Sequence, residues 1–272
     1  VALRARWDGA AHGRLRAAFA PRFAVSCSRR LLEAVAALSA RDRVIVHTHA
    51  SESRDEVDVV RRLSGGLSNL EYLNATGLAS ERLCAAHCVW VSDAEQALMA
   101  ERDVKVMHCP GSNLKLGSGI APVVDMRQRG ICVSLGADGA ACNNRLDMFD
   151  EMRLAATLQA MRRAPGSLTA RDVLWMATRE GARAMGLQDE LGSVEPGKRA
   201  DLILVSRDRP HLSPDADPWS TLVYGARGTD IRMTMVDGEV LVDEFRLSRL
   251  DGAEIASDAK QAAREVAGRA GV

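Results

Sequence analysis

The sequence carries no excess of either charge. Its 272 residues include 36 basic and 36 acidic side chains, so the formal net charge at pH 7 is zero. Nucleic acids and anionic membranes are bound mainly through an excess of Lys and Arg. The sequence also lacks any apolar run approaching the roughly 20 residues that cross a bilayer. We therefore expect neither a nucleic-acid partner nor a membrane partner.

Paired cysteine motifs are absent as well. The six cysteines show no Cys-x-x-Cys spacing, and four of them lie in apolar runs: Cys84, Cys88, Cys109 and Cys132. Buried thiols of this kind are typical of a reducing compartment, so we expect a cytoplasmic protein. The sequence opens VALRARWDGA, without an initiator Met or a signal-peptide pattern. We expect it to begin within a longer protein.

From residue 19 to residue 187, short apolar runs alternate with stretches whose apolar residues have helical spacing. The runs lie at 19–23, 44–49, 83–88, 104–109 and 132–139, and the helical stretches at 28–42, 54–63, 93–103 and 121–130. This alternation predicts an α/β fold with a parallel sheet. A closed (β/α)₈ barrel of the TIM type needs eight strands and about 250 residues. The five runs therefore predict the second half of such a barrel, over residues 1–187.

The pattern changes after residue 187. Residues 192–208 contain a Gly-Lys turn and an apolar strand, and residues 234–245 form a hairpin pattern about Asp237-Gly238. We predict a small β-sandwich portion at 188–250, an appendage at the C-terminal end of the barrel. Residues 251–272 are rich in Ala and predict a peripheral helix.

Ionisable residues follow four successive apolar runs. They are His47, His49 and Glu52, then His87, then His108, and finally Asp138. Active sites of parallel α/β barrels lie at the C-terminal ends of the strands. The repetition from run to run predicts that these side chains share one site.

The residue types indicate particular roles. An imidazole such as His49 suits Zn²⁺ or Fe²⁺, and a carboxylate three residues on, Glu52, can move protons. Asp138 is costly to bury unless it holds a metal or a proton, and a buried His87 needs a partner. His47 lies one pleat below His49, where a supporting or packing role is expected.

For His108 the sequence leaves function and packing equally open. In the loop after it, Ser and Asn side chains either cap the next helix or touch substrate.

The strings HTHASE, AAHCVW, HCPGSNLKLGSGIAPV and LGADGAACNNRLDMFDEMRLA resemble the amidohydrolase superfamily. The likeness is greatest to its branch of methylthioadenosine/S-adenosylhomocysteine and 5'-deoxyadenosine deaminases. The resemblance implies one divalent ion, zinc or iron, with His49 and Asp138 as ligands. It implies a purine-type small-molecule substrate and a homo-oligomer.

The resemblance also implies a reaction, the hydrolytic deamination of a purine-type ring. The ion lowers the pKa of a bound water, and Asp138 accepts a proton from this water. Glu52 protonates the ring nitrogen beside the attacked carbon, His87 stabilises the developing charge, and ammonia leaves.

Three features of this sequence bear on that resemblance. The family's first two ligands form an H-x-H pair on its first strand, and no such strand precedes residue 19, so we expect the chain by itself to be inactive. Arg22 stands where adenosine-type deaminases carry His, and its guanidinium can donate to a carbonyl or to ribose hydroxyls. We predict that Arg22 binds substrate together with Glu52 and Asp138.

The sequence has no Lys before Lys105. This excludes the subclass of amidohydrolases in which a carboxylated Lys bridges two metal ions.

Other interpretations remain open at this point. The segment around Arg22 is similar to guanine deaminases, and triazine hydrolases act on a related ring. A non-enzymatic alternative is a truncated homologue that serves as a scaffold.

Overall fold

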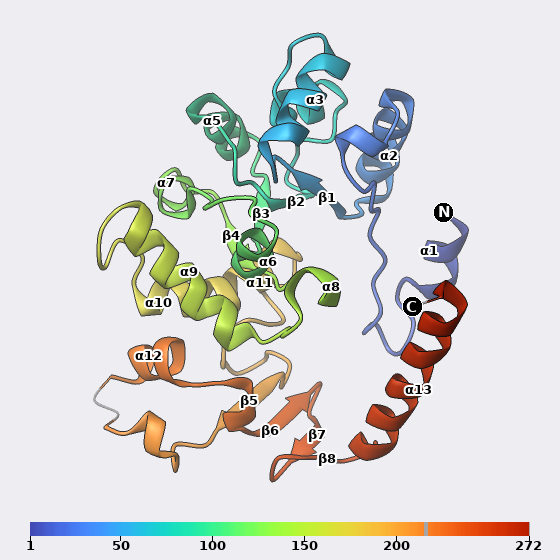
Figure 1. The fold of residues 1–272 in the computed structure, drawn as a ribbon. Coiled ribbons are helices and arrows are strands. Elements are labelled where there is room, and N and C mark those ends of the chain that lie inside the picture. Colours follow the sequence, from blue (N-terminus) through green and yellow to red (C-terminus); the bar gives the residue numbers. More distant parts are fainter. Residues whose placement is uncertain (215–216, 272) are drawn as a thin grey trace.

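The protein, described here by a computed structural model, is built on two β-sheets, and the structure describes residues 1–214 and 217–271. The first sheet is parallel, with its strands in chain order: β1 (Val46–Ala50), β2 (Leu83–His87), β3 (Lys105–His108) and β4 (Val133–Leu135). Helices follow each strand and pack outside the sheet (Figure 1). The predicted α/β fold with a parallel sheet is confirmed.

The four predicted crossover helices are present. They are α2 (Arg29–Asp42), α3 (Arg54–Ser64), α5 (Asp93–Glu101) and α7 (Val123–Gln128). The first three begin after a serine whose hydroxyl accepts a backbone N–H: Ser28, Ser53 and Ser92. The structure adds short helices that the sequence pattern did not indicate: α1 (Ala2–Trp7), α4 (Asn69–Ala75), α6 (Pro110–Lys115), α8 (Ala140–Asn143) and α12 (Pro218–Ser220). Single turns occur at Ala24–Ser26, Pro210–Leu212, Thr221–Gly225 and Gly228–Asp230.

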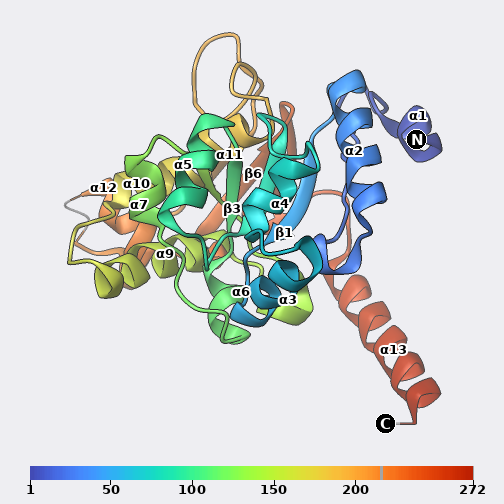
Figure 2. The same cartoon turned by 90° about the horizontal axis from the view of Figure 1, so that it is seen from above.

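Helices surround the parallel sheet in the two views of Figures 1 and 2, and the core cluster is made of buried residues from both the strands and these helices. Alternate strand residues such as Val46, Val106 and Val133 are fully or almost fully buried there. From the helices, residues including Leu32 and Met126 pack against them with no exposed surface. This packing fixes the strand register, and with it the position at which each strand ends.

The predicted strand at 19–23 forms only in part. Phe19 bridges Val46 and Phe23 bridges His49, both in parallel, without a continuous ladder between them. Pro21 explains the interruption because it has no N–H to donate. The segment nevertheless lies along the edge of β1.

Residues 170–184 form two helices instead of one continuous helix. Helix α9 (Met148–Arg162) precedes α10 (Ala170–Ala177) and α11 (Arg179–Ala184). Thr178 separates the last two, with φ −127° and ψ −83°, outside the helical region.

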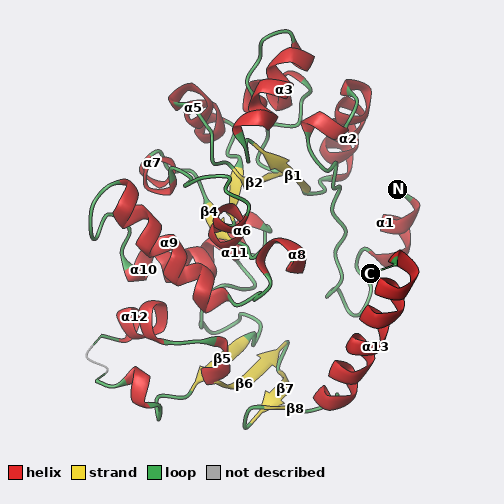
Figure 3. Cartoon of the chain, in the orientation of Figure 1, coloured by secondary structure: helices red, strands yellow, loops and turns green. Residues whose placement is uncertain are grey.

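The second sheet is antiparallel and is drawn at the bottom of Figure 3. Its order is β5 (Leu202–Val205), β6 (Ile231–Val236), β7 (Glu239–Asp243) and β8 (Arg246–Leu247). Asp237 and Gly238 join β6 to β7 with φ of 53° and 78°, the two positive values that a tight hairpin turn needs. The last helix, α13 (Gly252–Ala270), has no buried residue. None of the helices in the described ranges combines the length and apolar character needed to cross a membrane.

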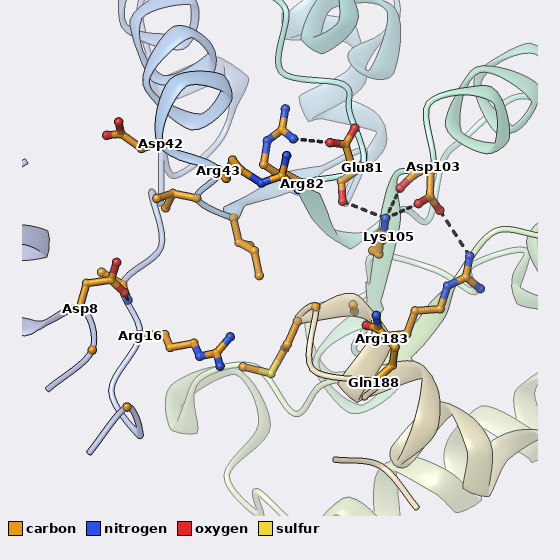
Figure 4. Close-up of a pocket in the computed structure, with 18 residues that line it drawn as sticks. Asp8, Arg16, Asp42, Arg43, Glu81, Arg82, Asp103, Lys105, Arg183 and Gln188 are labelled. Atoms are coloured by element: carbon orange, nitrogen blue, oxygen red, sulfur yellow. Dashed lines mark hydrogen bonds and ion pairs between the residues drawn. The ribbon is translucent and has the colours of Figure 1, made fainter. Parts of the chain in front are cut away.

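The amino-terminal edge of the parallel sheet is hollowed by a cavity of 880 Å³ with a charged lining (Figure 4). On β3, Lys105 Nζ donates to the Glu81 carbonyl at 2.8 Å and to the Asp103 carboxylate at 2.6 Å. Arg183 reaches the same carboxylate at 3.4 Å. Lys105 and Arg183 are thus both bound to Asp103, and the lining includes none of the predicted site residues that follow the strands.

One buried amide on α9 generates a prediction about stability. Gln159 is fully buried; its Nε2 donates to the Ala121 carbonyl at 2.9 Å, and its Oε1 accepts the Val124 N–H at 3.3 Å. Replacing Gln159 by Leu leaves the buried Val124 N–H without this partner and leaves the Ala121 carbonyl with the Val123 N–H alone, so we expect the free energy of unfolding to fall by about 1–3 kcal/mol. Urea unfolding measures this. Gln128→Leu, at an exposed position, should change it by less than about 0.5 kcal/mol; equal losses in both variants would contradict the account.

Candidate functional site

Three predicted site residues come together at the carboxyl ends of β1 and β2. One ligand atom each from His49, Glu52 and His87 lies within 4.8 Å of the others. The two imidazole rings are stacked, with centroids 5.2 Å apart and planes at 24°. Two imidazoles and one carboxylate are a donor set that suits Zn²⁺ or Fe²⁺.

The segment at 19–23, which lies along β1, orients the His49 ring. Its Nδ1 is 2.7 Å from the Arg22 carbonyl oxygen, and its backbone N–H donates to the same oxygen at 3.0 Å. A carbonyl oxygen only accepts, so Nδ1 carries the proton and Nε2 keeps its lone pair. Histidines that bind metals are oriented in this way.

The guanidinium of Arg22 lies over the Phe23 ring at 5.2 Å, and that ring is 5.5 Å from His49. The main chain of Arg22 thus supports His49, while its side chain is exposed at the edge of β1. A substrate contact of Arg22 stays a prediction.

His87 is oriented in the same way from the other side. Only 1% of its surface is exposed, and its Nδ1 is 2.9 Å from Asn113 Oδ1 on α6. Its Nε2 is therefore free, and it faces Glu52 Oε2 at 3.8 Å. The segment after His108, where a helix cap or a substrate contact was expected, supplies the partner of His87. No side chain caps α6, and a substrate contact stays a prediction.

A buried carboxylate fixes the backbone that carries Glu52. Glu56 Oε1 accepts the Ser51 N–H at 3.1 Å, and its Oε2 accepts the Glu52 N–H at 2.6 Å. The Glu52 side chain is 19% exposed, and the Ser118 hydroxyl donates to its Oε1 at 3.4 Å. The sequence analysis missed Glu56, although the Ser-x-x-Glu pattern at 53–56 offered a signal: it is typical of a helix N-terminus.

Asp138 follows β4 and is held by two donors. The Ser112 hydroxyl donates to its Oδ2 and the Gly139 N–H to its Oδ1, both at 2.6 Å. Burial raises the pKa of Asp138, but these two bonds and the charges of His87 and His49 outweigh it and hold the pKa below its usual value. Asp138 therefore stays ionised. It is a neighbour of the His49–Glu52–His87 group but is not one of its members within the described residues.

The backbone is strained where these residues follow the strands. Ser51, His87, Cys88 and Asp138 have φ of 53°, 70°, 47° and 62°. Non-glycine residues rarely adopt this left-handed conformation, and it costs about 1–3 kcal/mol at each position. Three separate loops therefore hold unfavourable conformations next to the same group of side chains.

Two other histidines considered from the sequence, His47 and His108, are not members of this group among the described residues. His47 is exposed and one pleat below His49, as predicted from parity. His108 is 1% exposed, and among the described residues neither of its ring nitrogens has a hydrogen-bond partner. Burial, together with the neighbouring His87, lowers the pKa of His108 to about 3.

The low pKa of His108 makes stability depend on pH. In the unfolded chain His108 binds a proton near pH 6.5, whereas in the folded protein it does so only near pH 3. Between these values the unfolded state binds more protons, so the free energy of unfolding falls as the pH falls. From pH 7.5 to pH 5.0, wild type should lose about 2 kcal/mol more than His108→Leu.

Urea unfolding at both pH values measures this difference. His12→Asn, which removes an exposed histidine, should follow wild type. An identical pH dependence in wild type and His108→Leu would contradict a neutral, buried His108.

Known proteins match this chain in sequence and in fold. The Amidohydrolase family profile matches residues 1–241. A 5'-deoxyadenosine deaminase of Methanothermobacter thermautotrophicus is 44% identical over 261 residues, 96% of this chain and 60% of that protein. A 5-methylthioadenosine/S-adenosylhomocysteine deaminase of Pelotomaculum thermopropionicum is 39% identical over 264 residues, 97% of this chain and 60% of that protein.

A solved structure agrees with these matches. The crystal structure of an adenosine deaminase from Xanthomonas campestris with bound zinc has a TM-score of 0.88 and 35% identity, covering 90% of this chain and 56% of that one. The chain spans about 60% of the length of the relatives named above. The family resemblance predicted from the sequence is confirmed: this chain belongs to the amidohydrolase family.

Proposed function

We propose that this chain carries the catalytic side chains of a metal-dependent hydrolytic deaminase that acts on a purine-type ring. One observation carries the proposal. Glu52 Oε2 lies 3.8 Å from His87 Nε2, beside the stacked ring of His49, at the carboxyl ends of parallel strands. A carboxylate and an imidazole at that distance can both reach the same ligand atom by hydrogen bonds and exchange protons with it.

The donor set fits a divalent cation. His49 keeps its Nε2 lone pair because Nδ1 is bonded to a carbonyl, and Asp138 is ionised. We propose His49 and Asp138 as ligands of one ion, zinc or iron, which leaves Glu52 and His87 for proton transfer. Such an ion lowers the pKa of water, so that hydroxide exists near neutral pH.

Asp138 and Glu52 would each carry out one of the proton transfers. Asp138 accepts a proton from the attacking water, and Glu52 gives one to the ring nitrogen beside the attacked carbon. The backbone of Glu52, fixed by Glu56, aims the carboxylate at this position. His87, when protonated on both nitrogens, donates from Nε2 to the developing charge while Asn113 holds Nδ1.

The substrate class follows from the relatives. Proteins named 5'-deoxyadenosine deaminase and 5-methylthioadenosine/S-adenosylhomocysteine deaminase align with almost the whole chain. We propose a small-molecule substrate of this class, with Arg22 contacting its ribose hydroxyls; a guanine ring would instead offer Arg22 a carbonyl oxygen. Guanine and triazine rings are the alternatives that the test below separates.

We further propose that residues 1–187 are the second half of a TIM-type barrel. The consecutive parallel order of β1 to β4 supports this, because barrel strands pair in chain order. Residues 188–250 would form a small β portion and residues 251–272 a peripheral helix. The six free cysteines support a reducing, cytoplasmic setting.

The test is ammonia release by the zinc-loaded protein, both as this chain and as the complete product of its gene. The panel contains 5'-deoxyadenosine, methylthioadenosine, S-adenosylhomocysteine, adenosine, guanine and a triazine. We expect turnover of the 5'-deoxyadenosine class by the complete product, and loss of that turnover on chelation. Glu52→Gln should lower kcat by roughly 10²–10⁴-fold because the proton donor is lost.

The matched control is Glu101→Gln, an exposed carboxylate on α5, which should keep the wild-type kcat. If the protein turned over only guanine or only a triazine, that compound would define the substrate class in place of 5'-deoxyadenosine. No turnover of any compound would leave a non-catalytic homologue as the better description. Full activity in Glu52→Gln would contradict the role of Glu52 as proton donor.

A further inference from the structure

A second buried carboxylate, Glu151 on α9, lies beneath the loop that carries Asp138. Only 1% of its surface is exposed. Its Oε2 accepts the Gly111 N–H at 2.9 Å, and its Oε1 accepts Asn143 Nδ2 at 2.6 Å. Both of its neighbours are donors and both of its oxygens accept. Burial raises the pKa of Glu151, and the hydrogen bonds from Gly111 and Asn143 oppose that rise by favouring the ionised carboxylate.

These two bonds belong to a closed ring of contacts. Asn143 Nδ2 also donates to the carbonyl of Ala137, at 2.9 Å, and Ala137 precedes Asp138. On the other side, Gly111 precedes Ser112, whose hydroxyl holds Asp138 Oδ2 at 2.6 Å. Glu151 thus holds both the backbone before Asp138 and the start of the helix that supplies its hydroxyl partner.

The space at Gly111 shows how closely the loops approach Glu151. A Cβ at Gly111 would lie 2.7 Å from Asn143 Nδ2 and closer still to Glu151 Oε1. A side chain at residue 111 would therefore displace the carboxylate. The same helix α6 carries Asn113, which orients His87. A displacement of α6 would reach both Asp138 and His87.

We propose that Glu151 is a positioning residue for the reaction: its carboxylate sets Asp138 and, through α6, His87 in the places the chemistry needs. This proposal rests on the proposed function. Glu151 touches neither substrate nor the reacting atoms, so it acts on the orientation of other groups. Metal-site partners of this kind typically contribute roughly 10- to 100-fold to activity or metal affinity.

The test compares Glu151→Gln with Gln159→Leu in the complete gene product. Gln159 is a matched control because it is also fully buried on α9 and also holds backbone groups, but those of Ala121 and Val124. In Glu151→Gln an NH₂ group faces a donor, so we expect kcat for 5'-deoxyadenosine to fall roughly 10- to 100-fold with KM nearly unchanged. Gln159→Leu should lose stability and keep kcat.

A double-mutant cycle with Ser112→Ala adds a readout that a purely structural role would not give. Because both substitutions act on the orientation of Asp138, their effects on kcat should be less than additive. Additive effects, an unchanged kcat in Glu151→Gln, or an equal loss of kcat in Gln159→Leu would overturn the proposal.

Amide hydrogen exchange tests the ring without relying on activity. Exchange at Gly111 and over residues 137–139 should accelerate in Glu151→Gln and stay at the wild-type rate in Gln159→Leu. If Glu151→Gln does not fold, Asn143→Ala removes the half-buried amide that joins Glu151 to the Ala137 carbonyl, and it should accelerate exchange at 137–139. Absence of ammonia release from wild type would defeat the proposed function alone, whereas unchanged exchange would defeat the positioning by Glu151.

Discussion

The site depends on the hydrogen bonds that fix the orientation of its two histidine rings. The Nδ1 atoms of His49 and His87 are bonded to oxygens of Arg22 and Asn113, so both Nε2 atoms are free on the same side. A buried imidazole without such a partner would be costly and free to turn. These bonds allow two imidazoles and a carboxylate to share one small volume, and the reaction proposed here needs that convergence.

Hydrogen bonds to buried carboxylates fix the loops that carry Glu52 and Asp138. Glu56 binds the backbone of Glu52, and Glu151 binds the loops on either side of Asp138. Glu56 lies on α3, directly after the loop that carries Glu52, whereas Glu151 lies on α9, which comes after Asp138 and the short helix α8. The left-handed backbone at Ser51, His87 and Asp138 persists because these bonds offset its strain. A preorganised arrangement of this kind favours catalysis because little reorganisation is needed during the reaction.

Much of this arrangement was predictable from the sequence, for physical reasons. Period-2 and period-3.6 patterns identify buried strands and covering helices, and polar residues at strand ends identify the active edge of a parallel sheet. The pattern could not show that Pro21 would interrupt the strand at 19–23, or that Thr178 would divide a helix. Nor could it identify Glu151, whose partners are the Gly111 N–H and the side chain of Asn143. For Glu56 the Ser-x-x-Glu pattern indicated a helix N-terminus but not the bonds to the backbone of Ser51 and Glu52. Such contacts depend on tertiary packing and leave no periodic trace.

The central claim is that side chains from separate strands converge on one cation. Anomalous diffraction at the zinc edge, from crystals of the zinc-loaded complete gene product, tests this most directly. The account predicts an anomalous peak bonded to His49 Nε2 and to the Asp138 carboxylate, with Glu52 and His87 facing it. A peak elsewhere on the molecule, with His49 and Asp138 turned away from each other, would contradict it.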